Sequence, residues 1–148
     1  MQSNRFSLKQ FVVVVLITSI WINASEVFRY FVFVMPQMQT FWQGANKPLA
    51  VMTPTIFMIW GLWDTLLTAI LVLAVWLFAK AFGPSLKQSL VAATFVWAAV
   101  FVIFWVAASN MGLADWAILW VALPLSWAEL AVGAFITQKL YATGRWAG

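Results

Sequence analysis

Long apolar runs separated by short polar breaks dominate the chain. A helix that rises about 1.5 Å per residue needs roughly 20 apolar residues to cross the hydrocarbon core of a membrane. Four segments meet that length, and we expect spans at residues 11–34, 51–79, 89–109 and 116–137. The pattern therefore predicts an all-α integral membrane protein, a four-helix bundle that forms one polytopic domain over residues 1–148.

The breaks between the predicted spans carry turn-forming residues. Pro36 is predicted to end the first helix, because an interior proline removes a backbone hydrogen bond. Gly83–Ser85 separates the second span from the third, and Asn110–Gly112 separates the third from the fourth. The longest connection, residues 36–50, is expected to lie along the membrane interface.

The two halves of the sequence show a faint likeness. A Phe-Val pair followed by a tryptophan and a small, polar ending occurs at residues 11–26 and again, without gaps, at residues 95–110. A duplication would make the protein two tandem helical hairpins, related by a pseudo-two-fold axis along the membrane normal. Such matches arise easily in apolar sequence, so the tandem hairpins stay a hypothesis.

Composition and charge agree with a membrane protein. Hydrophobic residues make up 65% of the chain and charged residues 8%, which excludes an ordinary soluble globule. The basic residues are scattered among apolar runs, so no nucleic-acid partner is predicted. If the chain crosses the membrane four times, six of its eight basic residues fall on one side of the membrane, and Arg29 and Lys47 fall on or near the other side. The six are Arg5, Lys9, Lys80, Lys87, Lys139 and Arg145. The positive-inside rule then places both termini in the cytoplasm, and we expect a bacterial inner membrane.

Missing residue types narrow the chemistry. The sequence has no cysteine, which excludes disulfides and thiolate chemistry, and no histidine, the commonest metal ligand and general base. No nucleotide-binding glycine loop or metal-ligand cluster occurs either, so we predict neither a cofactor nor a metal. Proton chemistry would fall to the four acids, or to tyrosine and lysine.

Two acids lie near the middle of predicted spans, where an ionised side chain costs roughly 2.5 to 3.5 kcal/mol on insertion scales. Asp64 and Glu129 are expected at similar depth in the second and fourth spans. One interpretation is a functional site that the two helices share; the other is that each acid only fixes helix register through a nearby hydroxyl or indole. Helical spacing puts these residues on the faces of the two acids: Trp60, Gly61, Thr65 and Thr68 with Asp64, and Ala122, Ser126 and Gly133 with Glu129.

The first span carries a polar face that we expect to point into the bundle. It comprises Thr18, Ser19, Asn23, Ser25, Glu26 and Arg29. Glu26 and Arg29 are three residues apart and can pair, either as part of the site or as an ion pair at the interface. Asp115 directly precedes the fourth span, where an acid is typical of a helix N-cap.

The eleven tryptophans divide into candidate pocket walls and packing stripes. Trp60, and with it Trp21, Trp63 and Trp105, are the candidates for a pocket wall. One stripe lies on the fourth span opposite Glu129, and we expect it to meet lipid or another subunit; it comprises Trp116, Trp120 and Trp127. A second stripe lies on the third span, and the sequence does not determine which way it faces. It comprises Trp97, Phe101, Phe104 and Trp105.

Three functional hypotheses follow. The leading one is a site that binds or transports a proton or an apolar, cationic small molecule. The rival is an enzyme that uses the acids to isomerise or cyclise a lipid-soluble substrate. The third is a non-catalytic subunit of a homo-oligomer or larger membrane complex in contact with lipid. The catalytic or ion-binding candidates are Asp64, Glu129 and Glu26, and the ligand-binding candidates are Asn23, Trp60, Thr68, Ser126, Trp21, Trp63 and Trp105.

The plan of four spans with a membrane-buried glutamate, Glu129, looks like that of small multidrug resistance transporters. Here, however, the acids lie on different helices and the chain is longer. The plan is also similar to that of the emopamil-binding and sigma-2-receptor group, in which carboxylates and aromatic residues surround a lipid-like amine or a sterol cation. Both resemblances concern architecture alone.

Overall fold

The computed structural model describes residues 6–45 and 49–144, and every regular element in these ranges is a helix. The elements in chain order are α1 (Leu8–Arg29), η1 (Tyr30–Val34), α2 (Met35–Gly44), α3 (Pro54–Phe82), α4 (Leu86–Trp97), η2 (Ala98–Val102), α5 (Ile103–Asn110), η3 (Trp116–Ile118) and α6 (Leu119–Ala142). The short segments η1 and η2 are π-helical turns, and η3 is a 3₁₀ turn.

These elements join into four continuous helices that are long and apolar enough to cross a membrane. They run over Leu8–Gly44, Pro54–Phe82, Leu86–Asn110 and Trp116–Ala142. The all-α four-helix fold predicted from the sequence is therefore confirmed, and the apolar length of the helices marks an integral membrane protein.

Local chemistry explains where the helices begin and end. Each of four helix starts has a side-chain oxygen that accepts a hydrogen bond from a backbone N–H in the first turn, as N-caps do. The predicted breaks at Gly83 and Gly112 are confirmed, and both glycines have a positive φ, 87° and 69°, which side chains disfavour. The caps are Ser7 for Gln10, Thr53 for Ile56, Ser85 for Gln88 and Asp115 for Ala117.

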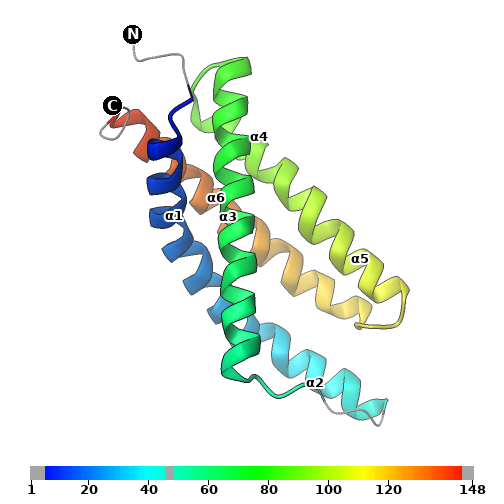
Figure 1. Ribbon diagram of the computed structural model, residues 1–148. Helices are drawn as coiled ribbons and strands as arrows, with labels where there is room; N and C mark the ends of the chain where they lie inside the picture. The colour runs from blue at the N-terminus through cyan, green and yellow to red at the C-terminus, as the bar shows by residue number, and fades with distance from the viewer. Residues whose placement is uncertain (1–5, 46–48, 145–148) are drawn as a thin grey trace.

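The predicted helix end at Pro36 is wrong, because the first helix continues through it into α2. A proline inside an α-helix lacks an N–H and clashes with the carbonyl four residues earlier. The π-helical turn η1 lies directly before Pro36, and there the Met35 N–H donates to the carbonyl of Tyr30, five residues back. This wider turn accommodates the proline, and the helix axis changes direction between α1 and α2 (Figure 1).

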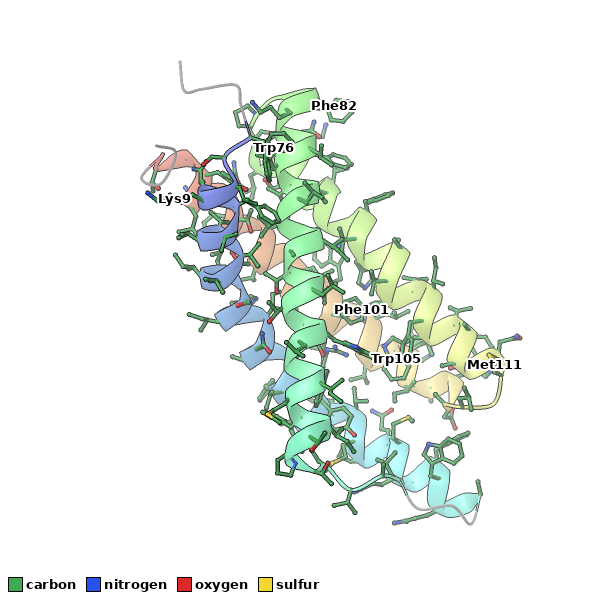
Figure 2. All side chains as sticks on the ribbon, viewed as in Figure 1. Lys9, Trp76, Phe82, Phe101, Trp105 and Met111 are labelled. Atoms are coloured by element: carbon green, nitrogen blue, oxygen red, sulfur yellow. The ribbon has the colours of Figure 1, made fainter. Side chains whose placement is uncertain are left out.

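The four helices form an open bundle. α1 packs against α3 and α6, α4 packs against the same two helices, and α3 contacts α6 across the bundle. The start of α1, the α3–α4 turn and the end of α6 lie at one end, whereas α2 and the turn between α5 and η3 lie at the other (Figure 1). Lys9 and Met111 mark these opposite ends in Figure 2.

The tightest packing occurs where α1, α3 and α6 meet. Gly133 on α6 has no side chain, and a Cβ placed there would lie 3.0 Å from both Ile22 Cδ1 and Leu71 Cδ2. Both of these side chains are fully buried. A small residue at this point therefore lets three helices approach closely, which is how helices associate in lipid.

Substituting Gly133 should test this contact. In detergent micelles titrated with SDS, Gly133→Ala is expected to lower the free energy of unfolding by about 1–3 kcal/mol, the range for overpacked interiors. Gly61→Ala is the matched control, because its Cβ would meet only Asn23 Oδ1 at an ordinary 3.5 Å. Equal stability of the two variants would contradict the close packing.

Candidate functional site

The polar face of α1 points into the bundle, as the sequence predicted. Thr18, Ser19, Glu26 and Arg29 are all buried, whereas Ile20 on the other side of the helix is 72% exposed. Because α1 packs against both α3 and α6, this face meets the two helices that carry Asp64 and Glu129. The three polar faces therefore converge.

An ionic cluster links α1 to α6. Arg29 Nη2 forms an ion pair with Glu26 Oε1 one turn earlier, and Arg29 Nε lies 3.8 Å from Glu129 Oε2. All three side chains are almost entirely buried. The Glu26–Arg29 pair is therefore buried between helices and not exposed on the bundle surface. Its depth in the membrane, and the assignment of Arg29 to the external side, stay predictions. The other basic residue counted there, Lys47, lies outside the described residues, as do Arg5 and Arg145.

The Glu129 carboxylate lacks good hydrogen bonds. Within the described parts of the chain, neither of its oxygens nor Arg29 Nε has a hydrogen-bond partner of good geometry, although all three atoms are buried. Native proteins leave few buried polar atoms in this state. A proton or a water molecule would satisfy the carboxylate oxygens, and a water oxygen would accept from Arg29 Nε.

Asp64 brings a third carboxylate from α3. Its side chain is buried, with an exposed fraction of 5%, and lies within electrostatic range of Glu26 and Arg29. Thr68 and Thr65 donate to backbone carbonyls of Asp64 and Gly61 and not to the acid. No three or more acids in residues 6–45 and 49–144 are arranged as a metal site.

A pocket of about 550 Å³ opens beside the cluster. Glu26, Arg29 and Asp64 supply its charged groups. Aromatic and aliphatic side chains from η1, α2, α3, η2 and α5, together with Leu49, supply the walls. Figure 2 shows Phe101 and Trp105 on the stretch of η2 and α5 that follows α4. The aromatic lining consists of Tyr30, Trp60, Trp63, Phe101, Phe104 and Trp105.

The aromatic walls are packed against each other and against the cation. Tyr30 and Trp60 are in edge-to-face contact with ring centroids 4.6 Å apart, and the Arg29 guanidinium lies 5.2 Å from the centroid of Phe101. Tyr30 belongs to η1 and Phe101 to η2. Both π-helical turns thus border the pocket, a position in which such turns are frequent.

Five residues proposed for the site from the sequence do not line the pocket. Glu129 lies behind Arg29, and Trp21 donates its indole N–H to the Glu129 carbonyl at 3.0 Å. Asn23 donates to the Ser19 carbonyl. Thr68 bonds to the backbone, as described above. Ser126 faces α4, where its Oγ accepts from the indole of Trp97 at 3.2 Å.

The two aromatic stripes differ in direction. Trp116 on η3 and Trp120 on α6 are 54% and 85% exposed, as expected for residues that face lipid or another subunit. Trp127 is partly exposed but donates to Thr94 on α4. In the third span, by contrast, Phe101 and Trp105 are buried and line the pocket.

Sequence reasoning missed several contributors to the site, among them Arg29 and Phe101. Arg29 was considered only as a partner of Glu26, although its place on the polar face was a signal that it also reaches α6. Phe101 carried no such signal, because a phenylalanine in an apolar span has many equivalent neighbours. Comparisons with protein-family models, curated proteins and solved structures found no match, so the geometry alone bears on function.

Removing the buried cation should destabilise the fold. Arg29→Met leaves the acids without their counter-charge, and loss of one partner from a buried ion pair costs roughly 3–5 kcal/mol. Unfolding in SDS-detergent mixtures measures the change, with Arg29→Lys as the charge-preserving control. Adding Glu129→Gln to Arg29→Met should restore part of the loss; a strictly additive double variant would refute the Arg29–Glu129 interaction.

Proposed function

We propose that this protein binds a hydrophobic cation, or a proton in its place, at the buried carboxylates. The observation that carries the proposal is a charge imbalance: Glu26 and Glu129 pair with a single guanidinium, that of Arg29, and Asp64 lies within electrostatic range of it. If all are ionised, the site holds a net charge of about −2 in surroundings where unbalanced charge is expensive. Protons or a bound cation would remove that charge.

The pocket suits a bulky cation with an apolar body. Its volume of about 550 Å³ falls within the roughly 300–1,000 Å³ typical of small-molecule sites. Aromatic faces attract positive charge and also bury apolar surface. The Phe101 ring already contacts one cation, the Arg29 guanidinium. Asp64 and Glu26, which both line the pocket, would receive the charge of the ligand.

The expected test uses tetraphenylphosphonium and tetraphenylborate, which share a shape and differ in the sign of their charge. Equilibrium binding to the purified protein in detergent should favour the phosphonium ion. Asp64→Asn should weaken that binding about tenfold or more, since it removes a desolvated charge partner without changing size. Glu26→Gln is expected to act in the same direction.

Asp115→Asn is the matched control, because Asp115 caps a helix outside the pocket and asparagine caps equally well. It should leave binding unchanged. Thermal unfolding of each variant separates loss of the site from loss of the fold. Equal binding of the two ions, or full binding by a folded Asp64→Asn variant, would reject the cation site and favour a structural subunit.

An enzymatic role is the second candidate, because two carboxylates line one apolar pocket. Glu26 and Asp64 would act as proton donor and acceptor in the isomerisation or cyclisation of a lipid-soluble substrate, with Trp60 stabilising positive charge. A new lipid-soluble product after incubation with membrane extract would favour the enzyme. The same product from Asp64→Asn would exclude this role for the acid.

We also propose that the protein resides in a bacterial inner membrane with both termini on the cytoplasmic side. Lys9, Lys87 and Lys139 belong to the start of α1, the start of α4 and the end of α6. These three helix ends lie at one end of the bundle, in agreement with the positive-inside rule (Figure 1). Reporters fused after Arg145 or inserted near Lys87 should be cytoplasmic, and one near Gly44 should be external. A cytoplasmic signal at Gly44 would contradict this topology.

A further inference from the structure

The pocket has an apolar rim on one side of the bundle. Leu66 and Ile70 of α3 and Val100 and Phe104 of the third span line it, and their exposed fractions are 62%, 44%, 36% and 57%. Leu66 and Val100 lie close to the middle of their spanning helices. Exposed apolar side chains at that depth contact lipid acyl chains, so the rim opens toward the interior of the membrane.

Towards the end of the bundle that holds the α3–α4 turn, the site is closed. One turn from Glu26 and Glu129, Ile22 packs with Leu71 over Gly133 so closely that a single methyl group would not fit without displacement. One turn further, Thr18 and Thr137 meet at 3.4 Å between their hydroxyl oxygens. These layers separate the carboxylates from that aqueous side.

Towards the end of the bundle that holds α2, the side chains that line the pocket are less exposed than those of the rim. Val34 is 3% exposed, and Met38 and Leu49 are only partly exposed. The side chains that leave the pocket most accessible are therefore those of α3 and of η2 and α5. In Figure 1, α3 and α5 diverge toward the end that holds α2.

We propose that the pocket is loaded sideways from the membrane, between α3 and η2–α5, by a hydrophobic cation that is already dissolved in the bilayer. The sign of the ligand's charge rests on the proposed function, whereas the route rests on the rim and on the closed packing of Ile22, Leu71 and Gly133. An ion that enters here exchanges its contacts with lipid acyl chains for contacts with the carboxylates of Asp64 and Glu26. It need not cross the packed core.

Narrowing the rim tests the route. The natural chain is reconstituted in lipid nanodiscs, and association and dissociation of tetraphenylphosphonium are followed by stopped-flow tryptophan fluorescence, with empty nanodiscs subtracted as the lipid background. Leu66→Trp and Val100→Trp add bulk at the rim and should slow both rates by about tenfold or more, with a smaller change in equilibrium affinity. The matched controls, Leu62→Trp and Ile103→Trp, are at exposed positions on the same helices that do not line the pocket.

The outcomes separate the two proposals. Slower exchange in the rim variants alone supports lateral loading. Binding that depends on Asp64 but exchanges at unchanged rates in both rim variants overturns the route and leaves the cation site intact. Binding that does not depend on Asp64, or no binding, overturns the ligand class. Loss of a dimer on size-exclusion chromatography in Leu66→Trp, but not in Leu62→Trp, would show that a second copy covers the rim and would also overturn the route.

Discussion

The site depends on the burial of three carboxyl groups and one guanidinium inside an apolar bundle, which leaves an excess of negative charge when all of them are ionised. Arg29 is the only cation in contact with the carboxylates among the described residues, and it divides its ion pairing between Glu26 and Glu129. A membrane interior offers little solvation for the remaining charge. If a cation or a proton is taken up at Asp64, as we propose, the charge balance at Glu129 changes as well, although Glu129 does not line the pocket.

Packing keeps this charged region small. Gly133 lets α1, α3 and α6 approach closely one turn away from the acids, which excludes water and ligand on that side. On the other side, the helix paths are altered by π-helical turns, and η1 and η2 supply Tyr30 and Phe101 to the pocket. The bundle is thus tightly packed at the level of Gly133 and open one helical turn away, at the level of the pocket. The lateral route that we propose for the ligand rests on that difference.

Helix periodicity alone predicted much of the site. It placed Glu26 and Arg29 on an inward face of α1, and it placed Asp64 and Glu129 at similar depth on faces that the structure brings together. It did not distinguish a residue that lines the cavity from one that lies behind it. Ser126 shares the helix face of Glu129, yet its hydroxyl pairs with Trp97 on α4.

The sequence by itself determined the four spans, the Asp115 cap and the polarity of each helix face, because length, capping and periodicity are local properties of a helix. Only the tertiary structure decided which faces meet and how far apart the helices stand. Pro36 shows where prediction from local properties fails. The proline was predicted to end the helix, but a π-helical turn five residues long accommodates it, and the helix continues in a new direction. The pocket likewise depends on the distance between α3 and α5, and that distance is set by contacts between residues far apart in sequence.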